Sequence, residues 1–273
     1  MMDHAGGFYI LNGNVQDPDT FKNLVVPKEK VVYEVLRAIE GKPLFFEDHY
    51  LRMKKSLDLI GVSLNYTQDE LRAEIKRLTD ENSQPNCNIK VMVYEVDGIQ
   101  RMLTYISKSY YPGRDEMDRG VPVSLLEIER ENPNAKVVNH QYKERVGRKI
   151  EEEGVFEFIL VNQWDYMTEG SRSNLFFIRG SKAYTAPGEH VLKGITRQYV
   201  MEACHRAGVE LVEELVDIKR LEEMDALFLS GTSIKVLPVS RVDQRMFSSS
   251  SNETVIAIRD EYDRLIEEYL KGN

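Results

Sequence analysis

The sequence predicts an α/β fold of mixed α+β character, arranged in two domains. Segments rich in β-branched and aromatic residues recur along the chain and are interspersed with segments of helical periodicity. A length of 273 residues is enough for two domains of ordinary size. A stretch with Pro and Gly at residues 110–115 is the best candidate boundary. We therefore expect a smaller N-terminal domain over residues 1–120 and a larger domain over residues 121–273.

Strands in the first half are predicted where β-branched and aromatic residues gather between turn residues. Residues 31–37 have this composition, and residues 41–43 (Gly-Lys-Pro) form a turn before the apolar residues 44–46, which predicts a hairpin. Further strands are expected at residues 88–94 and 103–107, around the turn at 97–98, and at residues 121–128.

Two helices are predicted between these strands. In residues 48–60 the apolar positions Leu51, Leu57 and Ile60 recur at near-helical spacing, and Gly61 supplies a stop. The second helix begins at Thr67, where Thr67 and Glu70 have the spacing of a capping box. Its apolar face is expected to consist of Leu71, Ile75 and Leu78.

The second half is expected to continue this mixture of elements. Helices are predicted from after Lys136 to about residue 153, from about 196 to 207, and from about 252 to 270. Strands are predicted near residues 156–162, 174–178, 182–185, 210–213 and 226–230. A polar turn at residues 167–176 separates two of these strands, and such a turn usually serves a ligand.

Composition excludes several classes of function. With 36 basic and 45 acidic residues the net charge is −9, so the surface repels nucleic acid and favours a small-molecule role. No apolar run approaches the roughly 20 residues that span a bilayer. An acid stands at Asp3, where a secretory signal would carry positive charge, which predicts cytoplasmic residence. Cys87 and Cys204 are expected to be reduced packing residues, and no metal site is expected.

One lysine and one acid could serve pyridoxal phosphate chemistry. Lys136 lies among neutral residues, where an amine could be desolvated and react with the aldehyde of the cofactor. Glu169 could supply the carboxylate that keeps the ring nitrogen of the cofactor protonated. Taken alone, Lys136 reads as a surface residue and Glu169 as a turn acid.

Two segments could bind a phosphate. Residues 193–197 (Lys-Gly-Ile-Thr-Arg) enter a predicted helix, whose first N–H groups lack backbone partners. Residues 230–233 (Ser-Gly-Thr-Ser) leave a predicted strand into a turn with N–H groups that could bind an anion. Each segment alone is a weak signal, because Gly-Thr turns are common.

The order of these motifs resembles the class IV aminotransferases, the family of branched-chain and D-amino-acid aminotransferases and aminodeoxychorismate lyase. The resemblance covers most of the chain from Tyr33 to Asp243. It implies a two-domain fold type IV enzyme with pyridoxal 5'-phosphate between the domains. The motifs that carry it are Lys136 with Asn139, Thr168-Glu169-Gly170 with Asn174, residues 194–197 and Gly231-Thr232.

The resemblance also implies roles for individual residues. Lys136 resembles the Schiff-base lysine, Glu169 the partner of the pyridine nitrogen, and Tyr33 an active-site tyrosine. Arg52 resembles a phosphate ligand on a His-x-x-Arg helix, in which His49 is expected only to cap or pack. The remaining phosphate ligands implied are Ile195, Thr196, Gly231 and Thr232.

The substrate pocket departs from the family pattern. The family usually has a glycine-rich segment where this chain has residues 23–30, and the arginine motif of some relatives is missing. A bidentate guanidinium binds a carboxylate well, so Arg101 and Arg172 are the candidate readers of the substrate carboxylate. Both could equally be solvated.

The expected function is an aminotransferase that moves an amino group from a branched-chain or D-amino acid to a 2-oxo acid, using Lys136. The family resemblance implies a homodimer. A pyridoxal phosphate lyase that releases pyruvate, similar to aminodeoxychorismate lyase, is one alternative. A non-catalytic binding protein on the same fold is another.

Overall fold

The computed structural model describes residues 3–27, 29–128, 136 and 139–272 and divides the chain into two compact units. Unit 1 comprises residues 1–110, 135–140 and 269–273, and unit 2 comprises residues 111–134 and 141–268. The boundary expected at residue 120 therefore falls inside unit 2. The reason is that helix α3 (Arg114–Arg119) packs on strand β15 (Lys235–Val242).

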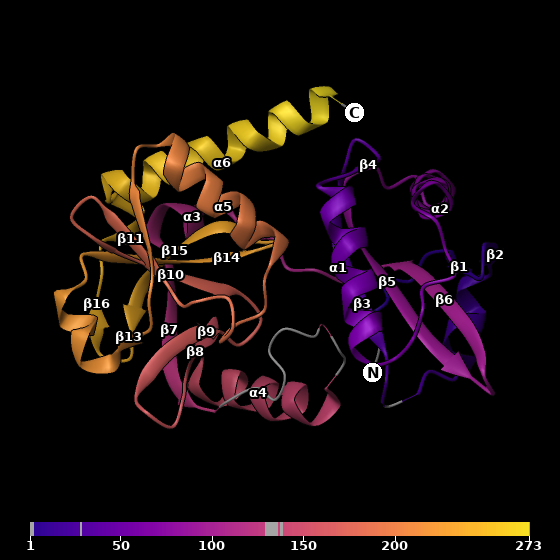
Figure 1. Ribbon diagram of the computed structural model, residues 1–273, viewed down its shortest axis with the longest axis horizontal. Helices are drawn as coiled ribbons and strands as arrows, with labels where there is room; N and C mark the ends of the chain where they lie inside the picture. The colour runs from indigo at the N-terminus through magenta and orange to yellow at the C-terminus, as the bar shows by residue number, and fades with distance from the viewer. Residues whose placement is uncertain (1–2, 28, 129–135, 137–138, 273) are drawn as a thin grey trace. The chain divides into compact units, whose positions relative to one another are not determined.

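Within the described residues, unit 1 contains a six-stranded antiparallel sheet in the order β2-β1-β6-β5-β3-β4 (Figure 1). Tight turns with positive φ at Asp97 and Gly98 join its central strands, as the sequence predicts. A hairpin forms at the predicted place, but its second strand is Lys42–Pro43, which was expected to lie in the turn, and residues 44–46 lead into the first helix instead. The strands are β1 (Tyr9–Leu11), β2 (Asn14–Gln16), β3 (Val32–Ile39), β4 (Lys42–Pro43), β5 (Cys87–Val96) and β6 (Ile99–Ile106).

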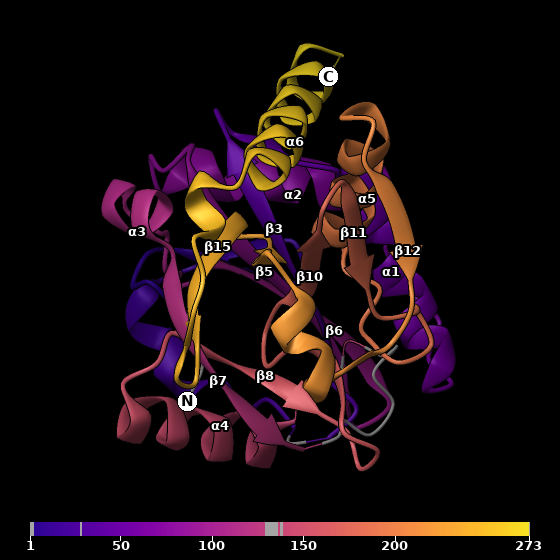
Figure 2. The ribbon, with the colours of Figure 1, turned by 90° about the vertical axis from the view of Figure 1, so that its left-hand side faces the viewer.

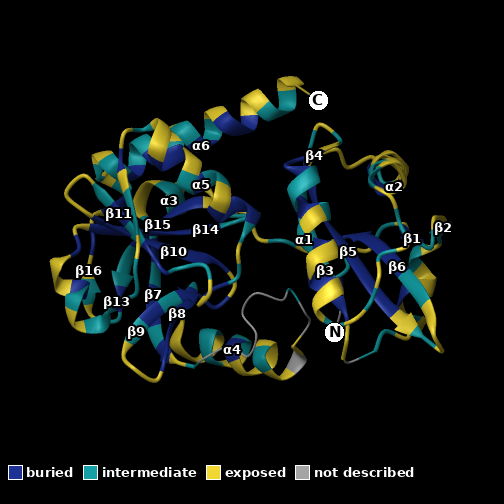
Figure 3. Ribbon diagram, in the orientation of Figure 1, coloured by how far each residue is buried: buried dark blue, intermediate teal, exposed yellow. Residues whose placement is uncertain are grey.

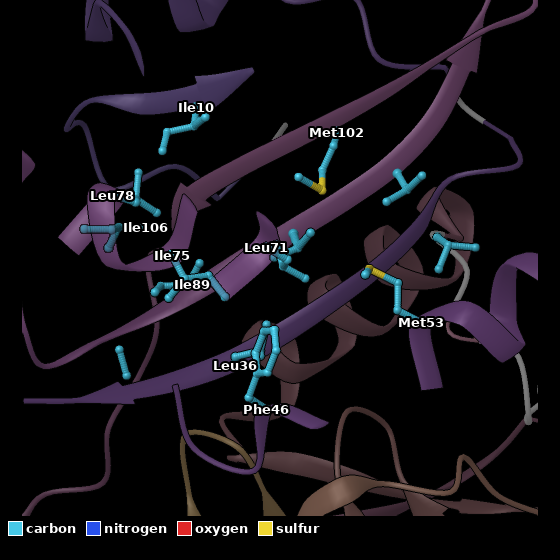
Figure 4. Close-up of a cluster of buried hydrophobic side chains, with 14 of the residues drawn as sticks. Ile10, Leu36, Phe46, Met53, Leu71, Ile75, Leu78, Ile89, Met102 and Ile106 are labelled. Carbon is cyan, nitrogen blue, oxygen red and sulfur yellow. The ribbon is translucent and has the colours of Figure 1, made fainter. Parts of the chain in front are cut away.

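Helices α1 (Phe46–Leu59) and α2 (Gln68–Glu81) supply side chains to a core shared with this sheet (Figure 4). The capping box of Thr67 and Glu70 is confirmed at the start of α2. One expectation for α1 is wrong, because Leu51 is exposed. The core includes Leu36, Phe46, Met53, Leu71, Ile75, Leu78, Ile89 and Met102.

Strand β3 contributes side chains to two different hydrophobic clusters of unit 1. Its residues alternate between buried and half-buried, and Val32, Leu36 and Ala38 belong to the core shared with the helices. Tyr33 belongs to a second, aromatic cluster with Tyr9, Phe21, Met92, Tyr94 and Tyr105. The central strand β5 is buried along most of its length (Figure 3). Residues of opposite parity on β3 therefore have different environments.

The described residues of unit 2 form a ten-stranded mixed sheet. Its order is β12-β11-β10-β14-β15-β7-β8-β9-β13, and β16 pairs with β15. Strand pairs β11–β12, β15–β7 and β7–β8 are parallel. The strands are β7 (Val121–Glu127), β8 (Glu157–Val161), β9 (Tyr166–Gly170), β10 (Asn174–Arg179), β11 (Lys182–Thr185), β12 (Glu210–Glu213), β13 (Val216–Asp217), β14 (Ala226–Gly231), β15 and β16 (Arg245–Met246).

The described part of unit 2 has three longer helices, α4 (His140–Glu153), α5 (Ile195–Arg206) and α6 (Glu253–Gly272). The first residue of α4 and the residues of α6 after Glu268 are assigned to unit 1. Helix α4 lies along β7 and β8 (Figure 2), where Val146 joins a cluster with Leu126, Val155 and Phe158. The basic residues of α4, such as Lys143 and Arg145, are exposed. All three helices were predicted within a few residues of their observed bounds.

Two further expectations can be judged from the described residues. Both cysteines are buried and free, as expected of reduced packing residues. No described helix is long and apolar enough to cross a membrane.

Candidate functional site

The acid of the central motif lies on a strand and not in a turn. Glu169 belongs to β9, and the turn that follows is confined to residues 171–173. The residue is 2% exposed, and its carboxylate accepts hydrogen bonds from the Leu192 N–H at 3.0 Å and the Asn174 side-chain amide at 3.3 Å. The same Asn174 amide donates to the Leu192 carbonyl at 2.9 Å. Asn174 therefore ties the acid to the loop before α5.

The N-terminus of α5 has the features of an anion site. Gly194 is the N-cap and provides no side chain to accept from the first N–H groups of the helix. A Cβ atom on Gly194 would lie 2.2 Å from Oδ1 of Asn174, so a larger residue would not fit there. Ile195 and Thr196 follow as buried residues of the first turn. Burial raises the pKa of Tyr262, with a smaller opposing effect from its hydrogen bond with Thr196.

The end of β14 lies beside the same asparagine. Ser230 is the register partner of Asn174, and Gly231 and Thr232 follow it directly. The Ser230 hydroxyl is buried and has no hydrogen-bond partner among the described residues. A buried hydroxyl normally has a partner, so this one fits a site that receives a polar group. Unit 2 thus brings Glu169, the N-cap of α5 at Gly194 and the end of β14 at Ser230 to Asn174.

Lys136 and Tyr33 lie together in unit 1. The Tyr33 N–H donates to the Lys136 carbonyl at 3.1 Å, which ties the lysine segment to the start of β3. The Lys136 ammonium lies 5.1 Å from the centroid of the Tyr33 ring. A cation at this distance is attracted by the face of an aromatic ring. Lys136 and Tyr33 are therefore paired within unit 1.

A second lysine contacts the same tyrosine. Lys90 on β5 is 5% exposed, and its ammonium lies 5.2 Å from the Tyr33 ring centroid. It pairs with Asp3 at 2.8 Å, and Asp3 also accepts a hydrogen bond from Tyr105. Sequence reasoning missed Lys90. The available signal was a lone charge within the apolar strand sequence Ile-Lys-Val-Met-Val.

Arg52 is held by an acid from the neighbouring strand. Its guanidinium donates to both carboxylate oxygens of Glu34, from Nε at 2.8 Å and from Nη2 at 2.6 Å. His49 Nδ1 lies 2.8 Å from the same carboxylate. Burial raises the pKa of Glu34, but the charge and hydrogen bonds of Arg52 and those of His49 outweigh it and bring the pKa to about 2. Glu34 is thus a buried, ionised carboxylate.

The two arginines expected to read a substrate carboxylate differ in surroundings. Arg172 has an exposed side chain that donates to the Phe156 carbonyl at 2.6 Å and lies over the Phe156 ring. Arg101 is half-buried on β6 opposite Tyr94. The structure therefore places Arg172 in unit 2 and Arg101 in unit 1, and it gives Arg172 partners within its own unit.

A buried acid also organises the turn after Glu169. Glu157 on β8 accepts hydrogen bonds from the Arg172 N–H and from the hydroxyls of Ser171 and Ser173. Burial raises the pKa of Glu157, against the opposing charge and hydrogen bond of Arg172. Sequence reasoning did not select it, although an acid inside the apolar strand of residues 156–161 was a visible signal.

Comparison with known sequences finds one family and relatives that are similar over most of the chain. A family model described as "Amino-transferase class IV" matches residues 31–242. A D-alanine aminotransferase of Bacillus licheniformis is 26% identical over 231 residues, covering 81% of each chain.

Solved structures show the same fold. A branched-chain aminotransferase from Thermoproteus uzoniensis, solved with norvaline, has a TM-score of 0.84 at 22% identity and covers 97% of each chain. A Legionella pneumophila structure assigned to 4-amino-4-deoxychorismate lyase has a TM-score of 0.74 at 21% identity, covering 88% of this chain and 91% of that one. Other aminotransferases of this fold were solved with pyridoxamine 5'-phosphate or in a PLP-bound form.

Proposed function

The chain belongs to the class IV aminotransferase family, and we propose that it transfers the amino group of a D-amino acid or a branched-chain amino acid to a 2-oxo acid. The family uses pyridoxal phosphate, so the chain is a pyridoxal phosphate-dependent transaminase. The observation that best supports the proposal is the cluster around Asn174, where a buried carboxylate adjoins a helix N-terminus without a side-chain cap.

The residues of this cluster fit the cofactor. The N-terminus of α5 at Ile195 and Thr196 would bind the phosphate, together with Gly231 and Thr232. The N-cap Gly194, which has no side chain, and the Ser230 hydroxyl, which has no partner in the described part of the chain, support this assignment. Glu169 would accept a hydrogen bond from the ring nitrogen. The Asn174 amide and the Leu192 N–H, which donate to its carboxylate, hold it in place.

Lys136 is the residue that would bond covalently to the cofactor. When bound, the cofactor draws the electrons of the breaking Cα–H bond into its ring. The Lys136 amine would hold the cofactor before substrate arrives and then move the proton from the substrate Cα to C4′ of the cofactor. Tyr33 would orient this amine through its ring and its backbone N–H.

Arg52 would add a positive charge to the phosphate site, as the family resemblance implies. Substrate needs a cation for its carboxylate. Arg101 and Arg172 remain proposed for this role, and Lys90 is a third candidate because its ammonium contacts the same Tyr33 ring as Lys136. Burial favours Lys90 over the exposed Arg172, since a charge interaction is stronger away from water.

A lyase that releases pyruvate is the alternative, and the likeness to the Legionella structure keeps it in view. Such an enzyme would use the same Lys136 and Glu169. The difference is chemical, because transamination requires an acceptor 2-oxo acid and elimination does not.

The distinguishing experiment follows the visible absorption band of the bound cofactor. The purified protein would be mixed with a panel of D- and L-amino acids, and a 2-oxo acid would then be added. A band that a substrate bleaches and an oxo acid restores supports transamination and identifies the amino acid class. Transamination of alanine alone releases at most one equivalent of pyruvate per protein before an acceptor is needed. Release of pyruvate well beyond one equivalent without any acceptor would overturn the proposal in favour of the lyase.

We also propose that the protein is a cytoplasmic homodimer. Family resemblance supports the dimer, and two free cysteines agree with a reducing compartment. Sedimentation equilibrium tests the assembly directly. A mass twice that of the chain is expected, and a monomer mass at micromolar concentration would contradict it.

A further inference from the structure

A buried carboxylate underlies the arginine of the proposed phosphate site. Glu34 on β3 has the parity of Val32 and Leu36, whose side chains pack in the core with α1 and α2. Its side chain is 1% exposed. A charge placed in such surroundings is costly unless it is paired and hydrogen-bonded. The position of Glu34 therefore requires the partners that α1 provides.

Helix α1 presents two partners one turn apart. His49 and Arg52 are three residues apart, so their side chains lie on the same face of the helix. Arg52 donates from Nε to one carboxylate oxygen and from Nη2 to the other. His49 Nδ1 contacts the oxygen that also accepts from Nη2. Since two bonds from one planar group fix its plane, Glu34 determines which way the rest of the guanidinium points.

The charges of Glu34, His49 and Arg52 balance one another. Glu34 is ionised at neutral pH, since its pKa is about 2. Burial lowers the pKa of His49, so its ring is neutral and donates a hydrogen bond from Nδ1. The side chain of Arg52 is 11% exposed. One negative and one positive charge therefore remain, held in fixed geometry.

We propose that Glu34 is a positioning residue for Arg52, which it holds in the orientation that binds the cofactor phosphate. Glu34 acts through the arginine and does not itself touch the phosphate. The inference rests on the proposed function, because it takes Arg52 as a phosphate ligand.

The direction in which Glu34→Gln changes the affinity for phosphate distinguishes a positioning role from a purely electrostatic one. A carboxylate near a phosphate repels it, so a purely electrostatic role predicts that Glu34→Gln tightens phosphate binding. The positioning role predicts the opposite, since the neutral amide can accept only one of the two guanidinium hydrogen bonds and leaves Arg52 loosely oriented. A purely structural role would weaken binding of phosphorylated and unphosphorylated cofactor equally.

The experiment compares two ligands that differ only in the phosphate. Equilibrium dissociation constants of the cofactor-free protein are measured spectroscopically for pyridoxal phosphate and for pyridoxal. The expected result for Glu34→Gln is a loss of about 10-fold or more in affinity for pyridoxal phosphate, with less than about 3-fold change for pyridoxal. Glu74→Gln, at another buried glutamate of unit 1, is the matched control and should change neither constant.

Further variants keep the test decisive if Glu34→Gln does not fold. Arg52→Gln should lose the preference for the phosphorylated ligand. The double variant E34Q/R52Q leaves no buried charge unpaired, and it should match Arg52→Gln in this preference, because Glu34 then has no arginine to position. An additional loss of preference in the double variant would overturn the inference.

The outcomes distinguish the inference from the proposed function. If the wild-type protein binds neither ligand, the proposed function fails. If Arg52→Gln weakens phosphate preference while Glu34→Gln preserves or strengthens it, only the positioning role fails.

Discussion

Both units contain ionisable side chains that are buried away from water. Glu34, Lys90, Glu157 and Glu169 are each less than 9% exposed, and each has hydrogen-bond or ionic partners. Such partners are required, because an unpaired buried charge is strongly destabilising. The burial of each of these residues therefore depends on partners that lie elsewhere in the sequence.

The sequence revealed only some of these residues. Glu169 was singled out because its neighbours Thr168 and Gly170 form part of an ordered motif, and its role at the cofactor stays a prediction. Lys90 and Glu157 are single charges within apolar strands, and their burial depends on partners distant along the chain, such as Asp3 for Lys90. Pairings of this kind follow from tertiary structure and not from local pattern.

Lys90 gives a prediction about substrate binding. Lys90→Met removes the ammonium and keeps a long aliphatic side chain, while the partner Asp3 is partly exposed and can be hydrated. Loss of a charge-assisted hydrogen bond costs about 1.5–3 kcal/mol, so KM for the amino acid should rise about 10-fold or more with a smaller change in kcat. Steady-state kinetics measures both, with the exposed Lys76→Met as control. An unchanged KM would remove Lys90 from the candidates.

The Glu34 carboxylate predicts a loss of stability in acid. Its pKa is about 2 in the folded protein against an ordinary 4.5, so ionisation stabilises the fold above pH 4.5. This contribution, roughly 3 kcal/mol, is full at neutral pH and declines as pH falls from about 4.5 towards about 2. Urea unfolding of the wild type and Glu34→Gln measures it. Their stability difference should shrink between about pH 7 and about pH 3, and a constant difference would contradict the assignment.

At the scale of elements, periodicity and turn chemistry predicted most helices and the long hairpin of unit 1. The strand β9 was missed, because its polar residues Thr168 and Glu169 read as a turn. Strand β15 was missed as well, since Pro238 and Lys235 argue against a central strand. The structure accommodates Pro238 next to a register shift between Val239 and Arg241. Hydrogen bonding of β15 to β14 on one side and to β7 on the other therefore outweighs the low strand preference of Pro238 and Lys235.

The start of α5 gives a prediction for an element. Gly194→Ala would place a Cβ atom 2.2 Å from Oδ1 of Asn174 and displace the amide that holds Glu169. We expect stability to fall by about 1–3 kcal/mol and affinity for pyridoxal phosphate to fall about 10-fold. Thermal unfolding and cofactor titration measure the two effects.

The matched control is Gly147→Ala on α4, where no described atom lies within 4 Å of an added Cβ. Alanine should be tolerated there or stabilise the helix by about 0.5–1 kcal/mol. Equal effects of the two substitutions on cofactor affinity would show that the crowding at Asn174 is irrelevant to the site.

At the scale of the whole molecule, the proposed functional groups are divided between two units with separate cores. Lys136, Tyr33 and Arg52 belong to unit 1, whereas Glu169 and the helix terminus at Ile195 belong to unit 2. The sequence predicted two domains but not that residues 135–140 and 269–273 join the first unit. Those segments are distant in sequence, so composition carried no sign of the association.

Lys136 is the residue proposed to hold the cofactor. The most direct measurement is borohydride reduction of the protein loaded with pyridoxal phosphate, followed by peptide mass spectrometry. We expect a single phosphopyridoxyl group on Lys136, absent in Lys136→Ala. Modification of another lysine such as Lys90 in the wild type, or of no lysine at all, would show that Lys136 does not hold the cofactor.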